Sequence, residues 1–263
     1  KEPSKKRDDL SKSLRLLDPR FLERPGFAVE QSFIVIQRMM DTAMTVLHEA
    51  VGLIFDYSDE KYAKVEDLER QVDEYEDALL DYTIKITANS LNDADNEKLS
   101  IILHTINDVE RISDYAMNIA EQAQIKAKSP TPFSQAAMDE LKLCTSAFEN
   151  ITEKARYAMA ELDVRMAFEM RPLEDRIDQI NRDLSDTHII RLQKGICRIE
   201  NGINIVEMYN HLERIADHCY NISTTVLDFV AHFVDKDNPE VRYDRSHPRY
   251  AELMEYYEQK YRL

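Results

Sequence analysis

Two segments of this chain, VERISDYAMNIAEQA (109–123) and LERIADHCYNISTTV (212–226), share the pattern E-R-I-x-D-x-x-x-N-I at an offset of 103 positions. A second pair of segments, LERQVDEYEDALLDY (68–82) and LEDRIDQINRDLSDT (173–187), matches at an offset of 105 positions. The two offsets are nearly equal, although they come from different parts of the chain. They therefore predict that a unit of about 100 residues is present in two copies.

The sequence around these segments has the periodicity of long helices. Apolar residues recur at helical spacing, for example at Phe33, Ile36 and Met40, and few glycines or prolines interrupt them. Pro172 lies in the fifth helical segment, where we expect it to kink the helix or to mark its true start. The six helices are expected over residues 29–55, 58–90 and 97–127 and over residues 133–160, 164–192 and 195–233.

The predicted fold class is all-α, with two tandem three-helix bundles and a short Tyr-rich helix that Pro248 opens. The clearest linker is Ser129-Pro130-Thr131-Pro132, which separates the two copies. The predicted divisions are a leader at 1–27, a first bundle at 28–128, a second bundle at 129–233 and a C-terminal extension at 234–263.

Composition excludes several classes of protein. Only 4 of the 263 residues are glycine, which argues against sandwiches, barrels and glycine-rich nucleotide loops. Asp and Glu number 50 against 34 Lys and Arg, so the net charge of −16 makes nucleic acid an improbable partner. No apolar run approaches the roughly 20 residues that a membrane-spanning helix needs.

The duplicated segments carry acidic residues in the pattern E-x-x-x-D. Residues four positions apart lie on one face of a helix, and helical projection places these acids at the edge of the apolar stripe. Carboxylates in such a position need a neutralising partner. Each copy has two of these pairs, which are Glu69/Asp73 and Glu110/Asp114 in the first and Glu174/Asp178 and Glu213/Asp217 in the second.

Two kinds of partner could neutralise these acids. Arginines could reach across the helices, and the candidates are Arg70, Arg111, Arg176 and Arg214. A metal cation is the alternative, because four carboxylates per copy form an oxygen set that suits Mg, Mn, Fe or Ca, and Zn only with help from nitrogen ligands. His218, beside Asp217, could supply such a nitrogen, although a capped or solvated histidine is the simpler interpretation.

Two other functions use the same residues. The chain could be a carboxylate-bridged metal oxidase or hydrolase, or it could be a helical scaffold whose acids are solvated. An enzyme is disfavoured because the E-x-x-H of di-iron bundles, the G-x-S-x-G of hydrolases and the Walker A loop are absent. We therefore expect a binding protein without catalytic residues.

The duplicated unit, with VERISDYAMNIAE and LERIADHCYNIS on its third helix, resembles the PhoU family over residues 28–233. The resemblance implies a regulatory role in phosphate transport and phosphate homeostasis. It also implies that the E-x-x-x-D acids on the second and third helices are ligands of metal ions, with Fe, Zn, Mg or Mn as candidates. These ligands would be Glu69, Asp73, Glu110, Asp114, Glu174, Asp178, Glu213 and Asp217.

The segment LLDPRFLERPGFAVEQ (16–31) precedes the first copy and resembles the linker that joins bacterial sodium/phosphate cotransporters to a C-terminal PhoU-like domain. This resemblance implies a domain at the cytoplasmic face of the inner membrane, with a membrane transporter domain of the same polypeptide as its partner. The alternative is a stand-alone cytoplasmic regulator of phosphate uptake, whose partner is a separate phosphate transport or signalling protein. A homo-oligomer is compatible with both.

Overall fold

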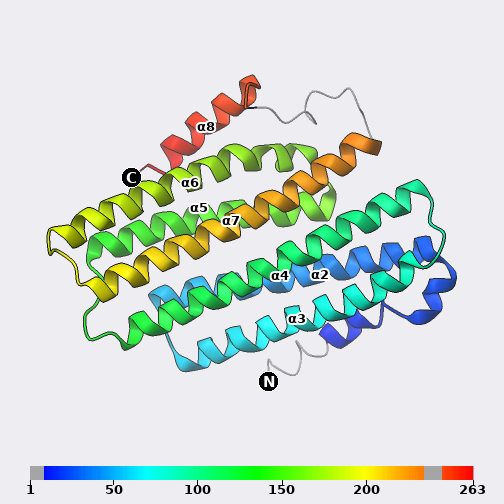
Figure 1. Cartoon of the computed structure of the whole chain (residues 1–263), viewed down its shortest axis with the longest axis horizontal. Helices are drawn as coiled ribbons and strands as arrows, with labels where there is room; N and C mark the ends of the chain where they lie inside the picture. The colour runs from blue at the N-terminus through cyan, green and yellow to red at the C-terminus, as the bar shows by residue number, and fades with distance from the viewer. Residues whose placement is uncertain (1–8, 234–244, 263) are drawn as a thin grey trace.

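The computed structural model describes residues 9–233 and 245–262, which form helices and short connections without a strand (Figure 1). This confirms the predicted all-α fold class. The elements are η1 (Pro19–Glu23), α2 (Pro25–Phe55), α3 (Asp59–Thr87), α4 (Asp93–Lys128), α5 (Gln135–Glu161), α6 (Val164–Gln193), α7 (Ile199–Phe233) and α8 (Pro248–Lys260).

Side-chain caps begin the helices at the breaks that the sequence indicates. The side chain of Ser58 accepts a hydrogen bond from the backbone N–H of Lys61 at the start of α3. Asn92, Ser134 and Asp163 cap α4, α5 and α6 in the same way. Each cap satisfies N–H groups that the first turn of a helix leaves without a partner.

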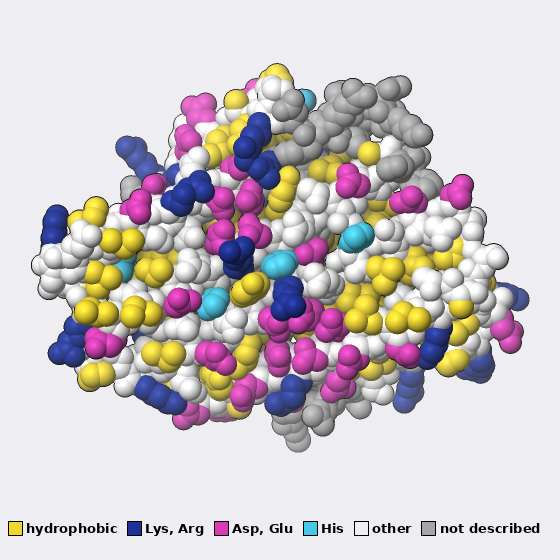
Figure 2. Space-filling view, in the orientation of Figure 1, with side chains coloured by type: hydrophobic (Ala, Val, Ile, Leu, Met, Phe, Trp, Pro, Cys, Tyr) yellow, Lys and Arg dark blue, Asp and Glu magenta, His cyan; other side chains and the backbone are white. Residues whose placement is uncertain are grey.

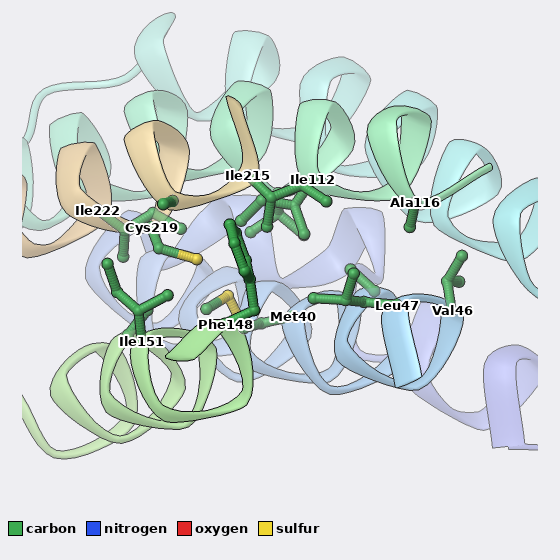
Figure 3. Close-up of a cluster of buried hydrophobic side chains, with 14 of the residues drawn as sticks. Met40, Val46, Leu47, Ile112, Ala116, Phe148, Ile151, Ile215, Cys219 and Ile222 are labelled. Carbon is green, nitrogen blue, oxygen red and sulfur yellow. The ribbon is translucent and has the colours of Figure 1, made fainter. Parts of the chain in front are cut away.

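The helices form two bundles that lie side by side, α2–α4 and α5–α7 (Figure 1). The third helices of the two bundles, α4 and α7, pack against each other, and α2 also contacts α5. The core is continuous across this seam. Figure 3 shows Met40 of α2, Ile112 of α4, Phe148 of α5 and Ile215 and Cys219 of α7 in one buried cluster.

Segments at both ends of the chain pack on the outside of the bundles. Tyr82 of α3 donates a hydrogen bond to the carbonyl of Asp18 at 2.9 Å, within the segment that the sequence predicts as a leader. At the other end, Arg176 of α6 donates to the carbonyl of Tyr261 at 2.6 Å, beyond α8. The basic residues 1–7 of the predicted leader and most of the polar stretch 235–246 fall outside the described residues.

Pro172 does not mark the start of a helix. It is buried inside α6, which begins at Val164 behind the Asp163 cap and continues to Gln193. None of the helices among the residues that the structure describes combines the length and the apolar character needed to cross a bilayer.

Candidate metal centres

The eight predicted ligands lie on the second and third helices of each bundle. Glu69 and Asp73 are on α3 and Glu110 and Asp114 on α4, while the second bundle carries its two pairs on α6 and α7. All these side chains are partly buried except Glu174, which is buried. Figure 2 shows Asp and Glu side chains gathered in two groups on one face of the molecule.

The second bundle brings three of its four acids together. Carboxylate oxygens of Glu174 and Asp178 on α6 and of Asp217 on α7 all lie within 4.8 Å of one another. Glu174 Oε2 and Asp178 Oδ1 are buried and have no hydrogen-bond partner. Buried carboxylate oxygens without a hydrogen bond are costly, so a bound cation would stabilise this cluster. We call it the α6–α7 cluster.

Three acids in and beside the α6–α7 cluster have raised pKa values. Burial, followed by the charge of Asp178, raises the pKa of Glu174 to about 7. Burial and then Asp178 also raise the pKa of Asp217 above its ordinary value. The pKa of Glu213 is raised by burial and by Asp217, although Glu213 lies outside the group of three. Acids that resist losing their protons in this way are acids that a bound cation would stabilise.

The first bundle forms a looser version, which we call the α3–α4 cluster. The pKa of Asp73 on α3 is raised by burial and then by the charge of Asp114 on α4. Glu69 is raised in pKa by burial, Asp73 and Asp114. Burial and the charge of Asp114 raise the pKa of Glu110 to about 7.

Arginines neutralise these acids only in part. Arg111 lies 3.4 Å from Glu110 and 3.2 Å from Asp114, and Arg214 contacts Glu213 and Asp217 at 3.7 and 3.6 Å in the second copy. Both arginines are on the same helix as their acids and are about half exposed, at 50% and 58%.

The other two candidate arginines are engaged elsewhere. Arg70 pairs with Asp67, and Arg176 binds the backbone of Tyr261. An arginine that was not among the candidates contacts the α6–α7 cluster: Arg171 lies 3.8 Å from Glu174. Arg182 also pairs with Asp178 at 3.4 Å, through the carboxylate oxygen Oδ2. The arginines therefore reach the rims of the clusters, and neither Glu174 Oε2 nor Asp178 Oδ1 receives a hydrogen bond.

One acid of the α3–α4 cluster was not among the predicted ligands. Glu76 is partly buried, and its pKa is raised by burial and then by Asp73, Asp77 and Asp114. It follows Asp73 by three positions, so the spacing could have placed it on the same helix face. Its counterpart in the second copy is Asn181, whose Oδ1 is also buried without a hydrogen-bond partner.

His218 does not join the acids beside it. Its Nδ1 lies 2.8 Å from Oδ1 of Asp108, a buried residue of α4, so the pair joins the two bundles. Asn221 donates to the same Asp108 oxygen at 3.4 Å, and the ring of Tyr115 stacks on the imidazole at 5.8 Å. The seam between the bundles therefore contains a polar group that the sequence alone did not indicate.

The residues present fit a hard cation. The donors in each cluster are carboxylate oxygens, the ligands that Mg²⁺, Mn²⁺ and Ca²⁺ take in proteins. Glu174 and Asp178, each with a buried oxygen that receives no hydrogen bond, are two of the three residues that would hold such an ion. A set without nitrogen or sulfur suits Zn²⁺ less well.

Comparison with known proteins places the duplicated unit in one family. The family model described as the PhoU domain matches residues 36–123 and 145–226. The chain is 24% identical to the PhoU homologue of the phosphate-specific transport system of Deinococcus radiodurans, over 74% of this chain and 87% of that protein. A homologue with the same description from Synechocystis is also 24% identical, over 82% of this chain and 94% of that protein.

Solved structures share the fold. PhoU from Pseudomonas aeruginosa superposes with a TM-score of 0.72 at 21% identity and covers 77% of this chain and 97% of its own. The phosphate transport system regulatory protein PhoU from Streptococcus pneumoniae has a TM-score of 0.63 at 20% identity, over 80% of this chain and 97% of its own. With two copies of the family's domain spread over most of its length, this chain belongs to the PhoU family.

Proposed function

We propose that this chain regulates phosphate transport and that it holds hard metal cations in the α6–α7 and α3–α4 clusters. Membership of the PhoU family supports the regulatory role, because its relatives are described as accessory proteins of phosphate-specific transport systems. The convergence of Glu174, Asp178 and Asp217 within 4.8 Å supports the metal sites. The role is binding, with a phosphate transport or signalling protein as the partner.

Calorimetric titration of the full chain with Mn²⁺, after treatment with a chelator, tests the metal sites. We expect saturable binding that Glu174→Gln/Asp217→Asn weakens at least about tenfold, because each substitution removes a charged ligand. Thermal unfolding should show the same ion raising the melting temperature, since a ligand that binds only the folded state stabilises it.

The matched control is Glu149→Gln/Glu153→Gln, a pair of exposed acids four residues apart on α5. It removes the same number of acidic groups from an exposed helix face outside both clusters, so it should leave Mn²⁺ binding unchanged. Absence of Mn²⁺ binding by the unaltered chain would refute the metal sites and leave the regulatory role standing.

The regulatory role is tested in a bacterial strain that lacks its own PhoU protein. Expression of this chain should restore the control of phosphate uptake by external phosphate. Uptake that stays uncontrolled in the presence of a folded chain would count against the role. If the unaltered chain restores control, the Glu174→Gln/Asp217→Asn variant shows whether that control requires the α6–α7 cluster.

A narrower proposal concerns the partner. The segment 16–31 resembles the linker of sodium/phosphate cotransporters, and in the structure it contains η1 and the start of α2 at Pro25. It supports a domain attached at the cytoplasmic face of the membrane to a transporter of the same polypeptide. Sequencing the coding region upstream of Lys1 tests this, because a series of apolar spans there would be required.

A further inference from the structure

The end of the second bundle where α6 meets α7 exposes an unusual set of apolar side chains. Five isoleucines in 15 residues of chain are exposed by about half to two thirds of their surface. Figure 2 shows hydrophobic side chains gathered at this end of the molecule, at the left of the view, with Lys and Arg around them. We call this surface the isoleucine tip; it consists of Ile189 (48%), Ile190 (48%), Ile196 (69%), Ile199 (68%) and Ile203 (59%).

Local structure holds these residues together. Gly195 ends α6 with a positive φ of 66°, and the N–H of Ile196 bonds to the carbonyl of Arg191 at 3.0 Å, so the chain turns tightly. Gly202 then lies so close to Leu192 that a Cβ at this position would stand 2.7 Å from the leucine side chain. The close approach brings the first turns of α7 beside the last turn of α6.

The outward direction of the isoleucines on α7 follows from their neighbours. Asn201 donates to the carbonyl of Thr131 at 3.2 Å, and Asn204 donates to the carbonyl of Gln122 at 3.0 Å. Asn201, Gly202 and Asn204 therefore face the protein. Ile199 and Ile203, four residues apart, share the remaining side of the helix and point to solvent.

Charge at the tip is opposite to that of the whole chain. Lys194 and Arg198 lie in the connection itself, and Lys128 lies beside it, because its neighbour Ser129 contacts Asn201 at 3.3 Å. All three cations are exposed and have no ion pair among the residues that the structure describes. Between positions 189 and 203 the only acid is Glu200. In a chain of net charge −16 this is a local excess of positive charge.

We infer that the isoleucine tip docks the protein on an anionic lipid bilayer. Aliphatic side chains ringed by Lys and Arg match the boundary between acyl chains and acidic headgroups. The charge of the rest of the molecule supports this occupant, because acidic faces are repelled by an anionic surface and the basic end is attracted to it. The protein is therefore expected to bind in one orientation, with the isoleucine tip against the bilayer and the acidic clusters away from it. This inference does not depend on the metal sites.

Flotation of the full chain with vesicles tests the inference. Binding is expected to vesicles of phosphatidylcholine with phosphatidylglycerol, to be weak with phosphatidylcholine alone, and to fall as salt rises. Ile196→Ser/Ile199→Ser should lower the bound fraction at least about tenfold. Lys194→Glu/Arg198→Glu should lower it by a similar factor, since each basic residue contributes roughly fivefold in affinity.

Controls separate the tip from general effects. Ile84→Ser replaces an isoleucine of α3 that is 67% exposed, and Lys12→Glu/Arg165→Glu reverses two exposed cations far from the tip in the chain. Both should bind vesicles as the unaltered chain does. All variants change exposed residues, and circular dichroism should confirm that they fold.

Three results would overturn the inference. The first is no binding of the unaltered chain to anionic vesicles. The second is binding that the tip and control variants reduce equally. The third is light scattering that shows a dimer abolished by Ile196→Ser/Ile199→Ser without vesicle binding, because the tip would then be an interface between two copies of this chain.

Discussion

Nδ1 of His218 in the second bundle lies 2.8 Å from Oδ1 of Asp108 in the first. By the offset of 103, the counterparts of these residues are Tyr115 and His211, and their rings also lie together, with centroids 6.0 Å apart. The α4–α7 seam is therefore roughly symmetric in its geometry, but the two copies have diverged in chemistry. One half is an imidazole–carboxylate contact and the other is an aromatic contact.

Asp108→Asn should destabilise the protein by about 1–3 kcal/mol, because it weakens a charge-assisted contact of a buried carboxylate while keeping its size. The free energy of unfolding in denaturant measures the effect. Asp183→Asn, an exposed aspartate of α6, is the matched control and should change stability by less than about 0.5 kcal/mol. Equal effects of the two variants would show that the contact with His218 contributes nothing.

The raised pKa values of Glu110 and Glu174 predict how stability depends on pH without metal. Both values lie near 7 in the folded state against an ordinary value of 4.5, so the folded protein holds these protons more tightly than the unfolded chain. Protonation of the two carboxyl groups therefore stabilises the folded state. This contribution to the free energy of unfolding is complete below 4.5, the pKa in the unfolded chain, and is lost as pH rises through about 7. In the presence of a chelator, the free energy of unfolding should therefore fall between about pH 5 and pH 8, by at most about 3 kcal/mol for each group.

Removing the two titrating groups checks the origin of this slope. Glu110→Gln/Glu174→Gln should flatten the dependence on pH, whereas Glu149→Gln/Glu153→Gln on α5 should leave it as it is. Addition of Mn²⁺ at about pH 8 should restore stability to the unaltered chain, because the ion replaces the lost protons. A free energy of unfolding that rises with pH over this range, or a pH dependence that the Glu110 and Glu174 substitutions do not change, would show that these two groups are not its source.

The two clusters should differ in affinity for metal. Oxygens of Glu174, Asp178 and Asp217 lie within 4.8 Å of one another, whereas no three acids of the α3–α4 cluster come this close together. A preorganised site needs less free energy to assemble its ligands, so the α6–α7 cluster should bind metal more tightly. Glu174→Gln/Asp217→Asn should therefore remove the tighter binding, and Glu69→Gln/Asp73→Asn should remove the weaker binding. Titration of the two variants with Mn²⁺ distinguishes them, and equal losses would show that preorganisation does not set the affinity.

Two glycines should respond to alanine in opposite directions. Gly195 has φ of 66° at the end of α6, so Gly195→Ala should destabilise the protein by about 1 kcal/mol. Gly52 lies in α2 with no atom within 4 Å of an added Cβ, so Gly52→Ala should stabilise it by about 0.5–1 kcal/mol. Thermal or denaturant unfolding measures both, and changes of the same sign would contradict the conformational argument.

Periodicity and duplication were sufficient to predict the helices. The offsets of 105 and 103 correspond to α3 with α6 and to α4 with α7, and most helix boundaries agree within a few residues because Ser58, Asn92 and Asp163 act as caps. For Pro172 the sequence left a kink or a helix start open, and the structure excludes the start, because α6 begins at Val164. A proline signals a break from local sequence, but α6 continues through it because the surrounding bundle buries this part of the helix.

The site could be predicted only in part. Spacing along one helix showed which acids share a face, but it could not show that Asp217 of α7 lies against Glu174 and Asp178 of α6 while Glu213 does not. That difference depends on the rotation of two packed helices. The contact of Asp108 with His218 joins residues 110 positions apart, and no local pattern reports a contact of that kind.

Anomalous scattering from crystals grown with Mn²⁺ decides whether the two clusters hold metal, because it locates the ion. We expect a manganese peak coordinated by Glu174, Asp178 and Asp217, and a second, weaker peak among Glu69, Asp73, Glu110 and Asp114. Crystals saturated with Mn²⁺ that show no peak at either cluster would refute metal binding by these acids.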